Sequence, residues 1–182
     1  ARDGRIFDNS PVTPAVRAND ASDIWGAKGS CYSSQLSKPF ATTTLEEAQY
    51  GTLMPDSGQK PDVDLGLYSV TFNNDLEADW NTLDQFKSFR IEAARKQFRY
   101  FLEVFNPNVP DCGIEPQDTG DYVNDQIARM LAGVPRASRP EFLKMPYNSA
   151  ASMSALVAYD TSVVVGILGG PKSTTYDAFK LI

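Results

Sequence analysis

Lys144 is the residue whose type and surroundings point most directly to chemistry. It lies in the stretch 141–147 (Glu-Phe-Leu-Lys-Met-Pro-Tyr), whose aromatic and apolar residues predict a β-strand. Burial disfavours the charged ammonium group, and the neutral amine is a nucleophile that can form an imine with a carbonyl compound. The structural alternative is a lysine that reaches solvent from the strand end or pairs with a carboxylate.

Glu103 is the second candidate, because it is a carboxylate in the middle of another predicted strand, 100–105 (Tyr-Phe-Leu-Glu-Val-Phe). Strand alternation places it on the same face as Phe101 and Phe105. A carboxylate there is costly to bury unless it is paired, and Lys144 on the next strand would be a suitable partner. Alternatively, Glu103 points between sheet and helices and binds a backbone amide or an arginine.

The segment 169–174 (Gly-Gly-Pro-Lys-Ser-Thr) follows an apolar stretch and precedes a predicted helix. Gly169 and Gly170 would let the backbone approach an anion closely, and Lys172 would add a donor beside the amides of the helix start. The segment lacks the GxxxxGK[ST] pattern, so binding of a nucleoside triphosphate is not indicated. A simple turn in which Thr174 caps the helix is the alternative.

Asn73 follows the predicted strand 67–72, at a position where the loops of a barrel build sites. It is therefore a candidate for substrate binding, whereas the neighbouring Asn74 and Asp75 are ordinary turn residues. A magnesium site formed by Glu103 and Asn73 stays an open alternative that no spacing supports.

The composition narrows the chemistry further. The 182 residues include no histidine, which removes histidine nucleophile systems, histidine general bases and histidine-ligated zinc. A net charge of −6, from 17 basic and 23 acidic residues, argues against nucleic-acid binding. No run of 18 apolar residues predicts a membrane span, and no signal peptide is visible. We expect Cys31 and Cys112 to be free thiols in a reducing, cytoplasmic compartment.

Four predicted strands position these candidate residues, and predicted helices alternate with the strands along the chain. The predicted strands are 67–72, 100–105, 141–147 and 163–168, and the predicted helices are 80–98, 122–132, 150–159 and 174–182. Such alternation implies parallel strands joined by right-handed crossovers. A doubly wound sheet and part of a (β/α)8 barrel both fit this α/β pattern. A full barrel takes about 250 residues, so we expect an incomplete one.

Residues 1–62 are the least regular part of the chain, and we expect them to be a barrel portion with long loops. Residues 63–182 carry the βα repeats, and the whole forms a single domain. Short helices are predicted at 15–20 and 45–50. The second has a capping box, because Thr44 is followed three residues later by Glu47.

Taken together, the last strands resemble a known family. Leu-Lys-Met-Pro-Tyr, then a helix, then Val-Val-Val-Gly-Ile-Leu-Gly-Gly-Pro-Lys resembles the archaeal-type class I fructose-bisphosphate aldolases of the deoxyribose-phosphate aldolase superfamily, which are TIM barrels. The resemblance covers residues 65–182 and makes the four readable strands the fourth to the seventh of the barrel. Lys144 falls on the imine-forming lysine, and Tyr147 on a position common in the family. Gly169 and Gly170 fall on the glycine pair that helps hold substrate phosphate.

The resemblance implies a metal-independent class I aldolase or lyase of carbohydrate metabolism that needs no cofactor and acts on a phosphorylated sugar or related carbonyl compound. It also implies a homo-oligomer. Where the family often ends its fifth strand in Tyr-Pro, this chain has Phe105-Asn106-Pro107, so Glu103 or Tyr147 would have to supply the acid. The family's first-strand aspartate and eighth-strand phosphate loop have no visible counterpart. The alternatives are a metal-dependent TIM-barrel isomerase or lyase, and a non-catalytic aldolase-like binding or assembly protein.

Overall fold

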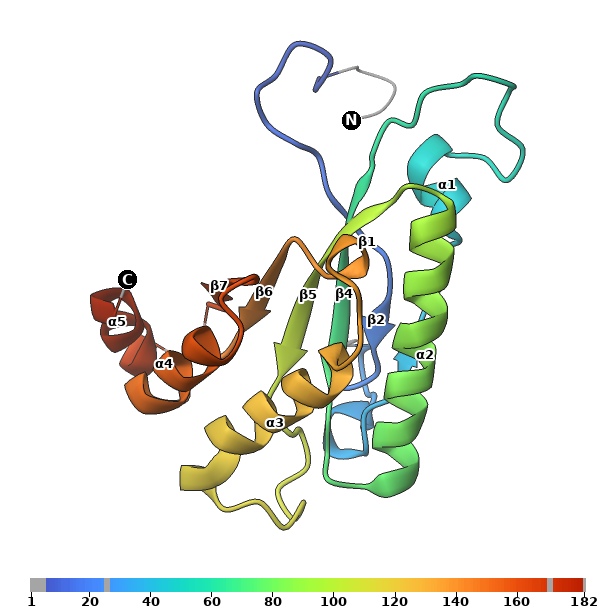
Figure 1. The fold of residues 1–182 in the computed structure, drawn as a ribbon. Helices are drawn as coiled ribbons and strands as arrows, with labels where there is room; N and C mark the ends of the chain where they lie inside the picture. Colours follow the sequence, from blue (N-terminus) through green and yellow to red (C-terminus); the bar gives the residue numbers. More distant parts are fainter. Residues whose placement is uncertain (1–5, 25–26, 170–171, 182) are drawn as a thin grey trace.

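The computed structural model describes residues 6–24, 27–169 and 172–181, the last range without the side chains of 172–174 and 181. Within these residues the chain forms a mixed α/β structure with a five-stranded parallel sheet, a two-stranded antiparallel sheet and five α-helices (Figure 1). The strands are β1 (Val16–Arg17), β2 (Asp20–Ala21), β3 (Pro39–Phe40), β4 (Leu65–Thr71), β5 (Arg99–Phe105), β6 (Phe142–Met145) and β7 (Val164–Ile167). The α-helices are α1 (Leu45–Tyr50), α2 (Leu76–Arg95), α3 (Thr119–Leu131), α4 (Ala150–Tyr159) and α5 (Lys172–Leu181). Short 3-10 helices are η1 (Tyr32–Ser34), η2 (Pro116–Asp118) and η3 (Arg136–Ser138).

The large sheet has the strand order β1-β4-β5-β6-β7, and every neighbouring pair is parallel. Its register aligns one row of residues across four strands: Ser69 lies opposite Glu103, Glu103 opposite Lys144, and Lys144 opposite Gly166. Because side chains alternate between the two faces of a strand, these residues share one face of the sheet.

The neighbouring row of the sheet faces the helices. Tyr68 stacks on Phe89 of α2 with ring centroids 4.3 Å apart. Further along the same face, Leu143 is buried in one cluster with Ile127 of α3 and Leu156 of α4. The helices α2, α3 and α4 therefore cover the same face, which forms the hydrophobic core (Figure 1). Burial in this core raises the pKa of the Tyr68 hydroxyl.

The opposite face of the sheet, which we call the charged face, carries Arg17, Ser69, Glu103 and Lys144. Phe101 of β5 and Phe142 of β6 lie on the same face, and their rings stack with centroids 4.5 Å apart. The charged face thus combines polar groups near the carboxyl ends of the strands with an aromatic pair nearer their amino ends.

The structure confirms the parallel α/β organisation and the four predicted strands, with shifts of one or two residues at their ends. The helix predicted at 150–159 has the bounds of α4, and α1 has the predicted Thr44 and Glu47 capping box. The helix α2 begins four residues earlier than predicted, because the Asp75 side chain caps it by accepting from Ala78 N.

The helix predicted at 15–20 is wrong. This segment forms β1 and the start of β2 instead, and Ala18 N donates a hydrogen bond to Leu67 O at 2.8 Å. The edge of β4 offers backbone hydrogen-bond partners to this segment. These partners lie far along the chain, so the local helix propensity of residues 15–20 does not reflect them.

Two further findings concern membrane-spanning helices and the cysteines. Among the described residues, no helix is long and apolar enough to cross a membrane. Cys31 is exposed and Cys112 half-buried, and the two are free thiols, as the sequence predicts.

Candidate functional site

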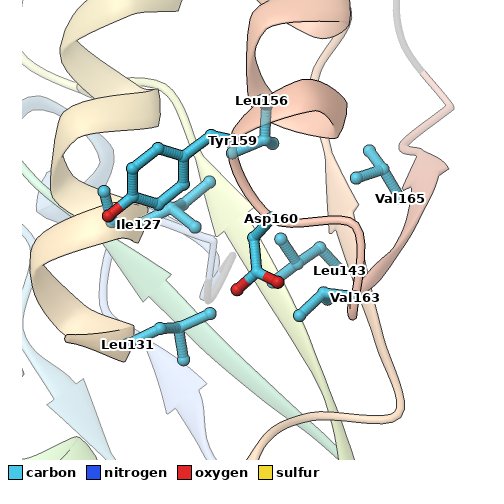
Figure 2. Close-up of a pocket in the computed structure, with 9 residues that line it drawn as sticks. Ile127, Leu131, Leu143, Leu156, Tyr159, Asp160, Val163 and Val165 are labelled. Atoms are coloured by element: carbon cyan, nitrogen blue, oxygen red, sulfur yellow. The ribbon is translucent and has the colours of Figure 1, made fainter. Parts of the chain in front are cut away.

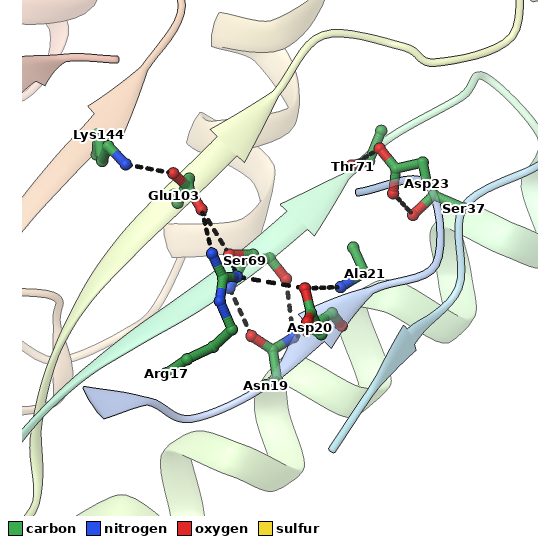
Figure 3. Close-up of polar contacts among 10 residues, drawn as sticks. All are labelled: Arg17, Asn19, Asp20, Ala21, Asp23, Ser37, Ser69, Thr71, Glu103 and Lys144. Carbon is green, nitrogen blue, oxygen red and sulfur yellow. Dashed lines mark hydrogen bonds and ion pairs between the residues drawn. The ribbon is translucent and has the colours of Figure 1, made fainter. Parts of the chain in front are cut away.

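The ion pair between Glu103 and Lys144 is the centre of the candidate site. Lys144 Nζ lies 2.5 Å from Glu103 Oε1 (Figure 3). The Glu103 side chain is 3% exposed, whereas that of Lys144 is 34% exposed. The pair therefore joins a buried carboxylate to a lysine whose side chain is partly exposed. The structure brings together the two principal residues that the sequence predicted.

The second oxygen of Glu103 is also occupied. Ser69 Oγ donates to Glu103 Oε2 at 2.8 Å, and Arg17 Nη2 lies 3.8 Å from the same oxygen. Arg17 Nη1 donates to Ser69 Oγ at 3.0 Å. One carboxylate thus lies between two cations and accepts from a hydroxyl, an arrangement that offsets the cost of burying its charge (Figure 3).

Asn19 fixes the backbone that presents Ser69. Its Oδ1 accepts from Ser69 N at 2.6 Å, and its Nδ2 donates to Ser69 O at 2.9 Å. The side-chain amide thereby takes the place of a neighbouring strand just beyond the end of β1. Asn19 is buried, and this pairing satisfies backbone groups of β4 that would otherwise lack partners.

Two aspartates extend the network toward the N-terminal segment. Asp20 Oδ1 accepts from Arg17 Nη1 at 3.4 Å and from Ala21 N at 3.1 Å. Asp23 accepts from Ser37 Oγ at 2.5 Å and from Thr71 Oγ1 at 3.1 Å (Figure 3). The Asp23 contacts tie the segment before β3 to β4. Arg17 and Asp20, together with Phe40 and Thr43, line a hollow of about 250 Å³.

The structure places Asn73 in a different set of contacts. Its Nδ2 donates to Asn108 Oδ1 at 2.8 Å, and its Oδ1 accepts from Asn108 N at 3.0 Å. Its backbone N donates to Asp79 Oδ1 at 2.8 Å. Asn73 is 2% exposed, so its side chain joins the loops after β4 and β5. Its role in substrate binding stays a prediction.

Tyr147 and the glycine segment are not brought to the ion pair by any contact of the described residues. Tyr147 lies two residues beyond β6, half-buried, and packs against the hydrophobic core. Gly169 is exposed after β7. Gly170 and the side chain of Lys172 lie outside the described residues. The proton-donor and phosphate-binding roles of these residues stay predictions.

An apolar crevice lies on the helix side of the sheet, between α3, α4 and the strands β6 and β7 (Figure 2). Leu143, Leu156 and Val165 line it, and Asp160 lies at its edge. A hydrogen bond from the Ser162 hydroxyl, together with Arg139, lowers the pKa of Asp160. The space open to water is about 10 Å³, too small for more than one water molecule, so this crevice is not a substrate site.

Sequence reasoning missed Arg17, Asn19 and Ser69. Arg17 and Asn19 lie in the segment interpreted as a helix, and Ser69 in a strand that was read for its apolar residues. A signal for Ser69 was present, because a hydroxyl in the middle of a buried strand needs a partner. No comparable signal identified Arg17. Within the described residues, no group of three His, Cys, Asp or Glu side chains lies close enough to hold a metal ion.

Comparisons with known proteins add no further assignment. No family model matches the chain, and neither a curated protein nor a solved structure matches it.

Proposed function

We propose that this protein is a class I, imine-forming aldolase or related carbon–carbon lyase in which Lys144 is the nucleophile. The observation that carries the proposal is the 2.5 Å contact between the amine of the partly exposed Lys144 and the buried carboxylate of Glu103. A nucleophilic lysine needs an adjacent group that removes its proton, and Glu103 lies within hydrogen-bonding distance.

The proposed reaction begins with transfer of a proton from the Lys144 ammonium to Glu103. The free amine then attacks the carbonyl carbon of the substrate, and loss of water gives a protonated imine. Glu103 returns its proton to the departing water and then takes the proton of the substrate hydroxyl beside the carbon–carbon bond that breaks. The protonated imine accepts the electron pair of that bond, so an aldehyde leaves and an enamine remains. Protonation of the enamine carbon and hydrolysis release the second product and restore the amine. Glu103 is the residue placed to take and return protons, and Tyr147 is the alternative donor.

The substrate class of the proposal is a phosphorylated sugar or a related carbonyl compound, as the family resemblance suggests. Gly169, Gly170 and Lys172 would hold its anionic end. The charged face carries two cations, Arg17 and Lys144, and both already contact the carboxylate of Glu103. We therefore assign the anionic end of the substrate to the glycine segment.

The strand order supports a barrel as the complete architecture. The strands β4, β5, β6 and β7 follow one another in sequence order across the sheet, and α2, α3 and α4 pack on one face. In a (β/α)8 barrel the helices lie outside and the other face lines the interior. We propose that the charged face is the barrel interior, with β1 beside β4 as the preceding strand.

Trapping of the imine tests the proposed function. The protein is incubated with dihydroxyacetone phosphate, glyceraldehyde 3-phosphate or related sugar phosphates, reduced with borohydride, and examined by mass spectrometry. We expect one adduct, located on the peptide that contains Lys144. Lys144→Met and Lys144→Arg should abolish it. Lys87→Met is the matched control and should retain it, because Lys87 pairs with Asp84 on the solvent-exposed side of α2.

The possible outcomes separate the alternatives. An adduct located on another lysine would overturn the assignment of Lys144. No adduct from folded protein with any of these carbonyl compounds would overturn imine chemistry altogether. Turnover that requires magnesium and is insensitive to borohydride would then favour the metal-dependent isomerase or lyase. Ligand binding without turnover, unchanged in Lys144→Met, would favour the binding or assembly protein.

A further inference from the structure

We propose that this protein has a second binding site, which takes an uncharged polyhydroxylated small molecule such as a monosaccharide or a cyclitol. The site is the hollow between the N-terminal strands and α2. This inference does not rest on the proposed function, because it starts from a buried hydroxyl group that has no hydrogen-bond partner in the described part of the chain.

The hydroxyl of Tyr68 carries the proposal. Tyr68 is 4% exposed and lines the hollow, yet its hydroxyl makes no hydrogen bond to any described residue. By contrast, Tyr100 donates to Ser138 O at 2.8 Å, and Tyr122 donates to Asp79 Oδ2 at 3.0 Å. Buried phenol hydroxyls normally have a partner, because an unpaired polar group loses its hydration without compensation. The unpaired hydroxyl therefore indicates that the hollow supplies its acceptor.

The hollow has room for a small molecule. The part beside Tyr68 has a volume of about 180 Å³. It adjoins the hollow of about 250 Å³ at the edge of β1, since four residues line both: Ala18, Asn19, Phe40 and Thr43. A single buried water needs only about 10–15 Å³, so the space exceeds that need by an order of magnitude.

One face of α2 supplies further hydrogen-bonding groups. Gln85, Ser88 and Glu92 line the part beside Tyr68, and their spacing of three and four residues places them side by side on the helix. None of these three side chains forms a hydrogen bond or ion pair with another described residue. Together with the ring of Phe40, they combine donors and acceptors with apolar contact, which suits a ligand that carries hydroxyl groups on a carbon ring.

The charges around the hollow disfavour an anionic ligand. Glu92 is a carboxylate beside Tyr68. At the other end, Arg17 already contacts the carboxylates of Asp20 and Glu103, so a phosphate there would meet negative charge (Figure 3). Hydroxyl groups need no counter-charge, and we therefore assign the site to an uncharged compound.

The test uses probes that have no free carbonyl group and cannot form an imine with Lys144. Methyl α-D-glucopyranoside and myo-inositol are titrated into the intact protein, and a myo-inositol monophosphate is the charged counterpart. Saturation-transfer difference NMR measures binding. Methyl signals locate it, because Leu45 lines the hollow, whereas Leu131 lines the crevice between α3 and α4.

We expect at least one of the two uncharged probes to bind with a Kd on the order of 1 mM, as is usual for so small a ligand. The methyl signals of Leu45 should shift and those of Leu131 should not. The monophosphate should bind about tenfold more weakly than myo-inositol, because it brings a negative charge to Glu92 and Asp20.

Tyr68→Phe is the decisive variant, since it removes the hydroxyl and keeps the ring that stacks on Phe89. It should weaken binding roughly threefold to tenfold, the effect of one lost hydrogen bond. Tyr100→Phe is the matched control and should bind as the wild type does, because its hydroxyl pairs with Ser138 and Tyr100 does not line the hollow. Circular dichroism shows that both variants are folded.

The outcomes decide the site and the ligand class separately from the proposed function. Failure of both uncharged probes to bind saturably to the folded wild type would overturn the proposed site. Equal affinities of wild type and Tyr68→Phe, or shifts at Leu131 in place of Leu45, would overturn its location. Tighter binding of the monophosphate than of myo-inositol would overturn the uncharged class. None of these results bears on imine trapping at Lys144.

Discussion

Glu103 shows how single residues of this protein combine burial with charge. Its carboxylate is nearly inaccessible to solvent, and a buried carboxylate without partners would be strongly destabilising. Lys144, Ser69 and Arg17 together contact both of its oxygens. The same contacts that make the charge tolerable place the amine of a partly exposed lysine beside a proton acceptor.

Removal of Lys144 should destabilise the fold, because Glu103 would stay buried with only the more distant Arg17 as a cationic partner. We expect Lys144→Met to lower the free energy of unfolding by about 1–3 kcal/mol, less than for a fully buried pair because Lys144 is partly exposed. The double variant Lys144→Met/Glu103→Leu should recover part of this loss, since it removes the stranded charge.

Urea denaturation at pH 7 measures these differences. Lys87→Met is the matched control and should change the free energy of unfolding by less than about 0.5 kcal/mol, because its pair with Asp84 is exposed. A double variant whose loss of stability equals the sum of the losses of Lys144→Met and Glu103→Leu would show that the two residues are not energetically coupled.

At the scale of elements, the termini of the helices are set by local hydrogen bonds. Asp75 caps α2, Ser149 caps α4, and Thr44 caps α1. Both partners of each bond lie within three residues, and the predicted starts of α1 and α4 are confirmed. The Asp75 cap was interpreted as a turn, so α2 begins four residues earlier than predicted. The strand edges depend instead on partners far along the chain, as Asn19 and Ser69 show.

The capping box of α1 gives a prediction at this scale. Thr44→Ala should lower the free energy of unfolding by about 1 kcal/mol, because Glu47 N loses its acceptor. Hydrogen bonds from the backbone and hydroxyl of Thr44 lower the pKa of Glu47. A lowered carboxyl pKa in the folded state contributes stability that is present above the unfolded value and is lost as the pH falls through the folded value.

The difference in stability between wild type and Glu47→Gln should therefore shrink as the pH falls below 4.5, the ordinary value for glutamate. Thermal denaturation of both proteins between pH 3 and pH 7 measures it. A difference that stays constant over this range would show that the Glu47 charge makes no contribution to the cap.

At the scale of the whole molecule, stability should be greatest at β4 and β5 and least toward β7. The strands β4 and β5 are paired over seven residues each, and most of those residues are buried. The strand β7 has four residues, and all of them are partly or fully exposed. Segments with few buried contacts open locally at lower free-energy cost.

Hydrogen exchange followed by mass spectrometry tests this gradient. Peptides from β4 and β5 should exchange slowest, those from β6 at an intermediate rate and those from β7 fastest. Equal protection of β7 and β5 in the intact protein would show that something further covers β7, such as another copy of the chain.

The sequence by itself determined the alternation of strands and helices, because hydrophobic periodicity and local caps act over short separations. It also singled out Glu103 and Lys144, since a charge within an apolar strand needs an explanation. Only the tertiary structure decided that they touch, because their meeting depends on the register of β5 against β6. It likewise decided that Arg17 shares the carboxylate, since the backbone partner that makes its segment a strand lies about 50 residues away.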